Sequence, residues 1–251
     1  MKRIKFIAAA IGVIIVLIGS VWIGNHYWKS TILELGYLFQ QQHNESFIRD
    51  IEQRISLGSG YYSPVEEIPE DELTVPDFIL LGARAEVNSR TRYDAAYVSI
   101  SYPGGDVSPD VGACTDVIIR AFRNAGIDLQ KLIHEDMKEN FNLYPKNWGL
   151  NAPDHNIDHR RVPNQIRFLE RFGTPLTTEV EGNLDQWQWG DVVYWRFSNG
   201  RDHCGIISDR TNKEGVPLVI HNASITREED CLLKWEITGH FCFHSLPDEE
   251  N

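Results

Sequence analysis

Four short apolar runs near the end of the chain restrict the fold more than any other feature of the sequence. They are rich in aliphatic and aromatic residues and cover 192–197, 204–208, 217–221 and 232–237. Gly-Asp, Asn-Gly and Lys-Glu-Gly breaks separate them, which is typical of antiparallel strands that follow one another as a meander. Upstream, an apolar stripe predicts a helix over Cys114–Ala125, and Gly126 supplies its stop. A helix followed by consecutive strands predicts an α+β fold.

Composition excludes several classes of protein. The 251 residues carry 36 acidic and 24 basic side chains, for a net charge of −12. So acidic a surface repels phosphate backbones, and we therefore expect no nucleic-acid partner. Four cysteines are too few for a disulfide-stapled scaffold, and no CxxC pair suggests a zinc ribbon.

The first residues predict a membrane anchor. Residues 1–5 form a basic start, and residues 6–24 carry no charge. A helix of that length spans about 28 Å, close to one hydrocarbon core. A secretory signal peptide is the alternative, but cleavage after Ser20 or Gly24 would place a large residue at the −3 position. We expect an uncleaved anchor with the N-terminus in the cytoplasm and the rest periplasmic or extracellular.

Two further segments complete the predicted organisation. Residues 25–76 combine a helical stalk with an acidic linker, because Pro64–Glu72 holds five acids and two prolines and predicts an extended, solvated spacer. Residues 77–247 are expected to form one compact domain, which opens with a short helix over Phe78–Val87.

Three positions in this domain suggest nucleophilic catalysis. Cys114 lies at the predicted start of a helix, where unpaired N–H groups and the helix dipole stabilise a thiolate and an oxyanion. His203 opens one predicted strand and His221 closes the next, so a hairpin would bring them together. His203 would then act as the base, and His221, with Asn222 as the substitute, would orient it.

The segments around these residues resemble the NlpC-type, papain-like cysteine peptidases. Cys114–Leu129 is similar to their nucleophile helix, and Asp202–Ile207 is similar to the segment that carries their base. Gln188–Trp195 and Val219–Asn222 resemble two of their strands. The resemblance implies a papain-like fold, in which the nucleophile helix packs on an antiparallel sheet.

A closer resemblance covers about Phe78–Phe243. It is to the family of domain of unknown function 1287, the YijF-like envelope proteins. The motifs that carry it are Tyr93–Tyr97, Tyr102–Val107, Cys114–Val117, His134–Met137, Asn156–Asn164 and Trp235–His240.

The chain departs from the NlpC-type pattern in two places. Thr115 and Asp116 stand where that family has Ser-Gly, and a nearby Asp116 charge would raise the pKa of Cys114. An insertion over Asp128–Trp187 separates the helix from the first strand.

The insertion carries residues of ligand-like composition. Asp154, His155, Asp158 and His159 could hold a metal ion, but Pro153 and Asn156 indicate a loop, and two arginines adjoin them. We therefore expect no metal site and no cofactor. The residues expected to bind substrate are Tyr102, Asp116, Arg160 and Arg161, and the two arginines would pair with a substrate carboxylate.

The other cysteines have structural interpretations. Cys204 follows His203 on a strand and should point to the opposite face, into the core. A disulfide between Cys231 and Cys242 stays open, because sequence does not establish its geometry.

The resulting hypothesis is a membrane-anchored thiol hydrolase of the cell envelope. The NlpC-type resemblance implies an amide of peptidoglycan stem peptides, or another envelope amide, as substrate. One alternative is a catalytically silent domain that binds peptidoglycan or a partner protein. Another is a thiol acyl hydrolase or transferase that acts on a lipid or thioester.

Overall fold

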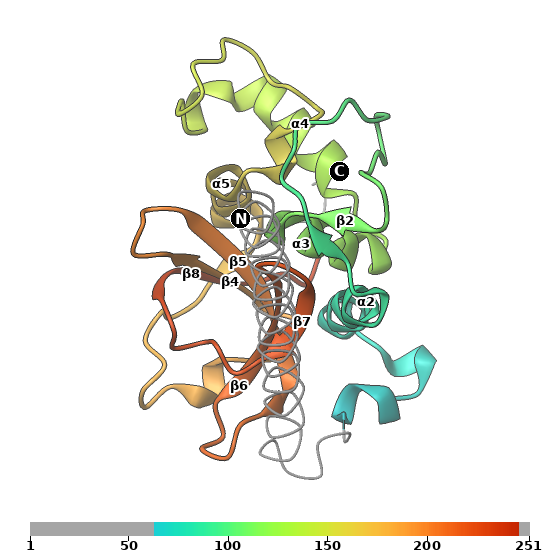
Figure 1. The fold of residues 1–251 in the computed structure, drawn as a ribbon, viewed down its shortest axis with the longest axis vertical. Helices are drawn as coiled ribbons and strands as arrows, with labels where there is room; N and C mark the ends of the chain where they lie inside the picture. The colour runs from blue at the N-terminus through green and yellow to red at the C-terminus, as the bar shows by residue number, and fades with distance from the viewer. Residues whose placement is uncertain (1–62, 246–251) are drawn as a thin grey trace, which may run out of the picture. The chain divides into compact units, whose positions relative to one another are not determined.

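The computed structural model describes residues 63–245 (Figure 1). The predictions for the basic start, the anchor and the stalk fall on residues outside this range. Within it, no helix combines the length and the apolar character that crossing a membrane requires.

Among residues 63–245, four α-helices precede or interrupt the main sheet. They are α2 (Val75–Ser89), α3 (Cys114–Asn124), α4 (Leu129–Asn140) and α5 (Val162–Phe172). Short 3-10 turns accompany them at η1 (Pro64–Glu67), η2 (Glu70–Glu72), η3 (Phe141–Leu143), η4 (Asp158–Arg160) and η5 (Leu184–Gln186). The predicted helices at 78–87 and 114–125 correspond to α2 and α3, whereas α4 and α5 fill the insertion.

The main sheet has six strands in the order β3-β8-β4-β5-β6-β7, and every neighbouring pair is antiparallel. The strands are β3 (Thr174–Pro175), β4 (Val192–Arg196), β5 (Asp202–Thr211), β6 (Pro217–Asn222), β7 (Thr226–Glu229) and β8 (Glu236–Cys242). A separate parallel pair joins β1 (Arg92–Tyr93) to β2 (Val111–Gly112). The α+β class is confirmed.

The strand order corrects part of the predicted meander. Strands β4 to β7 do follow one another, but β8 returns to pair with β4 on the other side. The last strand starts at Glu236, so most of the predicted 232–237 strand is a turn, closed by the Lys234 N–H on the Cys231 carbonyl.

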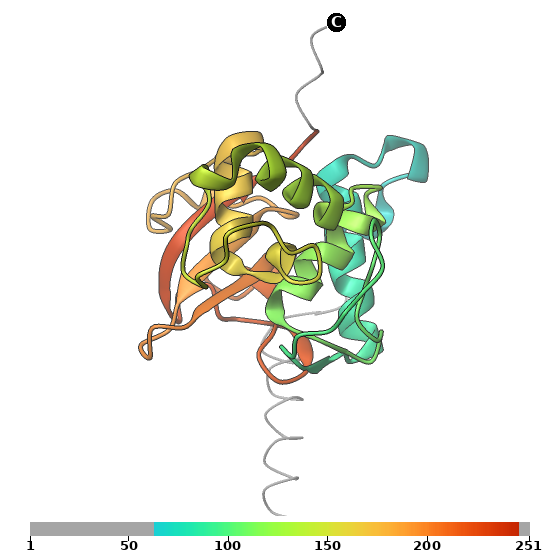
Figure 2. The same cartoon turned by 90° about the horizontal axis from the view of Figure 1, so that it is seen from above.

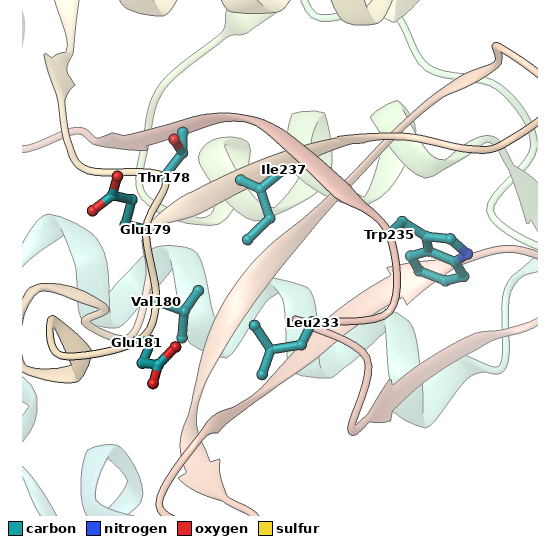
Figure 3. Close-up of a pocket in the computed structure, with 7 residues that line it drawn as sticks. All are labelled: Thr178, Glu179, Val180, Glu181, Leu233, Trp235 and Ile237. Atoms are coloured by element: carbon teal, nitrogen blue, oxygen red, sulfur yellow. The ribbon is translucent and has the colours of Figure 1, made fainter.

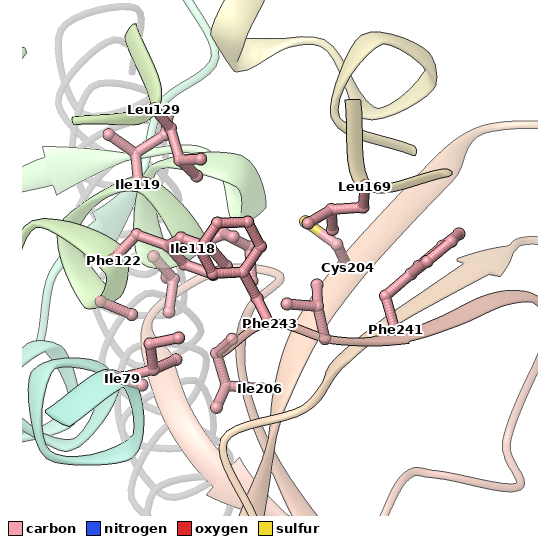
Figure 4. Close-up of a cluster of buried hydrophobic side chains, with 14 of the residues drawn as sticks. Ile79, Ile118, Ile119, Phe122, Leu129, Leu169, Cys204, Ile206, Phe241 and Phe243 are labelled. Carbon is pink, nitrogen blue, oxygen red and sulfur yellow. The ribbon is translucent and has the colours of Figure 1, made fainter. Parts of the chain in front are cut away.

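Apolar side chains cover both faces of the sheet. The helices pack on one face (Figures 1 and 2), and Figure 4 shows Ile118 and Phe122 of α3 beside Ile206 of β5 in the core between them. Val192 and Tyr194 of β4 belong to the same core. Their neighbours Val193 and Trp195 point into a second cluster on the other face. This alternation is the two-residue period of a strand buried on both sides.

The segment ahead of α2 differs from the expected solvated linker. Val65 is buried in the main core, and the Ser63 hydroxyl donates to Asp209 Oδ2 at 2.6 Å. Glu66 forms an ion pair with Arg84 of α2. These contacts hold residues 63–76 on the domain, whose packed part therefore begins ahead of the expected boundary at Asp77.

Candidate active site

Cys114 is the first residue of α3. Ala113 has extended backbone angles, and its N–H donates to Asp116 Oδ2 at 2.6 Å. This bond is half of a capping box, and it fixes where the helix starts. The first N–H groups of a helix have no acceptor within it, so the Cys114 side chain lies beside donors that can bind negative charge.

His203 and His221 are in direct contact, as the predicted hairpin requires. Strand β5 pairs with β6 at Ile206–Ile220 and Ile207–Val219. Beyond this register His203 Nε2 lies 2.7 Å from His221 Nδ1, and both rings are buried.

Glu229 extends this pair into a chain. His221 Nε2 donates to Glu229 Oε1 at 2.8 Å. With that proton on Nε2, the Nδ1 atom of a neutral His221 is an acceptor and takes the Nε2–H of His203. The second ring nitrogen of His203, Nδ1, then remains for Cys114.

Glu229 was missed in the sequence because β7, with the sequence Thr-Arg-Glu-Glu, shows no apolar alternation. The only available signal was its position one tight turn after the His221 strand.

The environment of Cys114 favours a thiolate. A hydrogen bond from the Cys204 thiol is the largest influence that holds the pKa of Cys114 well below its usual range. Burial opposes it, while the hydrogen bond and positive charge of His203 and the Cys204 N–H act in the same direction. Burial and the contact with Cys114 raise the pKa of Cys204 well above its usual range, so Cys204 keeps its proton.

His221 is held neutral and Glu229 is held charged. Burial lowers the pKa of His221, although Glu229 works against this, so the ring is held neutral. The hydrogen bond from His221 lowers the pKa of Glu229, which stays a carboxylate. A neutral imidazole held by a carboxylate matches the role of an orienting group.

Aromatic rings enclose the two histidines. Trp195 lies 5.8 Å from the His203 ring, and Phe197 lies 4.8 Å from it, measured between centroids. Trp235 contacts both histidines, and it also lines a surface pocket with Leu233, Ile237 and the segment 178–181 (Figure 3). Both histidines are buried behind these rings, and Trp235 is the residue that contacts them and also lines the surface pocket.

Tyr93 lies close enough to Cys114 for the thiolate charge to act on its phenol. It is 43% exposed, and burial together with the charge of Cys114 raises the pKa of its phenol. Cys114 itself is 6% exposed. Tyr93 of β1 therefore presents an exposed ring close to a nearly covered thiol.

Asn222 does not take the predicted role of substitute orienting group. Its side-chain amide donates to the carbonyls of Thr91 and Gly112, at 3.2 and 3.0 Å. It therefore ties β6 to the segments that lead into Cys114, and the ring nitrogen that meets His203 Nε2 comes from His221 rather than from Asn222.

Asp116 and Arg160 pair with each other rather than facing a substrate. Arg160 Nε and Nη2 each donate to one oxygen of Asp116 at 2.8 Å, and both side chains are buried. This bidentate contact balances the Asp116 charge that was expected to act on Cys114. Arg161 pairs with Asp158 and lies over the Trp148 ring. Neither arginine is free for a substrate carboxylate.

Tyr102 and the insertion histidines form a separate cluster. The Tyr102 ring packs against His134 and His155, and its hydroxyl donates to Glu135 at 3.4 Å. No contact joins Tyr102 to Cys114 or the histidine pair among the described interactions. His159 is buried, and burial lowers its pKa to about 3. In residues 63–245 the insertion histidines are in no group of three metal-binding side chains.

The remaining cysteines are thiols. Cys204 lies in the helix-side core, as predicted. Cys231 and Cys242 are not bridged, and the Cys242 sulfur lies 3.2 Å from His244 Nε2.

Comparison with known proteins places the chain in a family. The family model described as "Domain of unknown function (DUF1287)" matches residues 80–243. The chain belongs to this family. It is 48% identical, over 161 residues, to "Uncharacterized protein YijF" of Escherichia coli (strain K12), and the match covers 64% of this chain and 78% of that protein. The residues that the family model matches include Cys114, both histidines and Glu229. No solved structure matches.

Proposed function

We propose that this member of the DUF1287 family is a thiol hydrolase with a papain-like, NlpC-type catalytic arrangement. The observation that carries the proposal is the buried chain of contacts from Cys114 through His203 and His221 to Glu229. Such a chain supplies a nucleophile, a base and an orienting group in the order that nucleophilic catalysis needs.

In the first half of the reaction, the Cys114 thiolate attacks the carbonyl carbon of an amide. The electron pair of the C=O bond moves to oxygen, and the N–H groups at the start of α3 bind the resulting oxyanion. The oxyanion then reforms the carbonyl, and the C–N bond breaks. His203 passes its Nδ1 proton to the leaving amine, and a thioester with Cys114 remains.

In the second half, neutral His203 takes a proton from water, and the hydroxide attacks the thioester. The C–S bond breaks, which releases a carboxylic acid and returns the thiolate beside protonated His203. His221 accepts the Nε2–H of His203 throughout, and Glu229 holds the tautomer of His221 that makes this acceptance possible.

We propose amide bonds of peptidoglycan stem peptides, or another envelope amide, as the substrate, and a membrane anchor at residues 6–24 with the domain outside the cytoplasm. The resemblance to NlpC-type peptidases and the uncharged N-terminal run support these proposals.

The test is the release of soluble peptide fragments from purified sacculi by the full chain. We expect Cys114→Ala to abolish the release and Cys242→Ala to retain it, because Cys242 lies outside the catalytic chain. Equal release by the parent and Cys114→Ala, or no release by the parent, would overturn the peptidoglycan hydrolase. Saturable binding to sacculi without release would indicate a binding domain instead.

A further inference from the structure

A third side chain lies beside the two that orient His203. Cys231 follows β7 directly and is buried against the non-helical face of the sheet. The ligand atoms of His221, Glu229 and Cys231 all lie within 4.8 Å of one another. The catalytic chain uses the first two of these groups and leaves the Cys231 thiol without a role.

The register of β6 and β7 brings these groups together. Glu229 pairs with Val219, and Val219 shares a strand face with His221 two residues later. Cys231 is two residues beyond Glu229, so it continues the same face past the end of β7. Two neighbouring strands thus direct an imidazole, a carboxylate and a thiol toward one point.

We propose that His221, Glu229 and Cys231 form a binding site for a thiophilic divalent cation such as Zn²⁺. Nitrogen, carboxylate oxygen and thiolate sulfur are the zinc ligands found in proteins, and three of them leave a fourth position for water. Other divalent cations that prefer oxygen alone would bind weakly here, because one ligand is a thiolate.

The distances among the ligand atoms of His221, Glu229 and Cys231 are close to those of a zinc site, so only small side-chain movements are needed. Ligand atoms of a tetrahedral zinc ion lie roughly 3.5 Å apart, given Zn–N and Zn–S bonds of about 2.0 and 2.3 Å. His221 Nε2 and Glu229 Oε1, now at 2.8 Å, would separate slightly, and Cys231 would move inward. The Glu229 side chain is 21% exposed, which provides an entry path from solvent and room for its rotation.

The charges also balance. Glu229 contributes a carboxylate, and Cys231 would release its thiol proton to solvent when the cation binds. Neutral His221, one carboxylate and one thiolate then offset the two positive charges in a largely buried site. In the metal-free protein, burial and the Glu229 charge raise the pKa of Cys231, which therefore stays protonated.

Metal binding would have a direct consequence for the catalytic chain. The cation takes the Nε2 atom of His221, which now donates to Glu229, and it leaves the His221 proton on Nδ1. His221 Nδ1–H would then donate to His203 Nε2, whereas without the cation His203 Nε2–H donates to His221 Nδ1. This consequence rests on the proposed function, whereas the binding site itself does not.

The experiment is a titration of the full chain with Co²⁺, a spectroscopic substitute for Zn²⁺, in a Cys114→Ser background. This background removes the other thiol that lies beside a histidine in the active site. We expect a thiolate-to-cobalt charge-transfer band that saturates at one ion per chain and that excess Zn²⁺ displaces. A further Cys231→Ser change should remove the band, and Cys242→Ser, the matched control beside His244, should retain it.

Absence of the band in the Cys114→Ser protein would overturn the site, and so would its persistence in Cys231→Ser. If Cys231→Ser fails to fold, Glu229→Gln decides the question, because loss of the carboxylate should weaken Co²⁺ binding by about tenfold or more. Unchanged affinity in Glu229→Gln would overturn the assignment. Each of these measurements records Co²⁺ binding in a chain that lacks the nucleophile. A negative result therefore rules out the metal site but not the hydrolase, and a failed hydrolase test does not rule out the metal site.

Discussion

At the scale of single residues, Glu229 is the group that most changes the account of the active site. Glu229→Gln keeps the size of the side chain but removes the charge that holds the tautomer of His221. We expect the rate of thiol-dependent hydrolysis to fall about tenfold or more, in the range of a lost acid–base contribution. The pH midpoint of Cys114 alkylation should rise in the same variant. Asp230→Asn, an exposed neighbour that bonds Asn212, is the matched control and should change neither quantity.

Arg160 gives a second residue-scale prediction, about stability. Removing it in Arg160→Gln leaves the Asp116 carboxylate buried without its partner, and breaking such a pair costs about 3–5 kcal/mol. Arg196→Gln breaks an exposed pair with Asp202 and should cost less than about 1 kcal/mol. Chemical unfolding of both variants measures the two values. A similar loss of unfolding free energy in both variants would show that the buried Asp116–Arg160 pair stabilises the fold no more than an exposed pair does.

At the scale of elements, side-chain hydrogen bonds attach β6 to the segments that lead into α3. The Asn222 amide makes that attachment through the carbonyls of Thr91 and Gly112. Asn222→Ala should lower the free energy of unfolding by about 1–3 kcal/mol, because two buried hydrogen bonds are lost, although the Thr91 and Gly112 carbonyls keep the N–H groups of Thr226 and Asp94 as donors. The pH midpoint of Cys114 alkylation should stay unchanged, whereas His221→Ala should shift it. A shift in Asn222→Ala as large as in His221→Ala would restore Asn222 as an orienting group.

The elements also show what sequence could and could not predict. The apolar stripe of α3 predicted a helix that begins at Cys114, and the apolar runs of β5 and β6 predicted a hairpin that brings His203 to His221. The resemblance to NlpC-type peptidases implied that Cys114 lies beside these two histidines. Strand β7 pairs through its backbone and carries mostly charged side chains, so its composition did not predict a strand, and only its position soon after the His221 strand pointed to Glu229. Arg160 was misread as a substrate group because its partner, Asp116, lies 44 residues earlier and only the fold joins them.

At the scale of the whole molecule, burial of a neutral histidine makes stability depend on pH. Burial lowers the pKa of His159 to about 3, whereas an unperturbed histidine has a pKa of about 6.5. The unfolded chain therefore binds a proton below pH 6.5 that the folded chain does not bind until about pH 3. Stability from this group is present above pH 6.5 and is lost as the pH falls, by at most about 1.4 kcal/mol per pH unit.

Unfolding measured at pH 7 and pH 5 checks this expectation. The parent should lose more stability between these two values than His159→Gln, which carries no titrating group at that position. Equal losses in both proteins would mean that His159 accepts a proton in the folded state near its ordinary pKa.

The proposed hydrolase activity requires that Cys114 and His203 act as a nucleophile and its base. The most direct measurement is the alkylation rate of Cys114 in the full chain as a function of pH, with peptide mapping to separate it from the other three thiols. We predict a reactive thiolate that titrates well below an ordinary thiol, whose pKa is about 8.5, and that shifts upward in His203→Ala. An inert thiol, or one that titrates near the ordinary value with or without His203, would contradict the account.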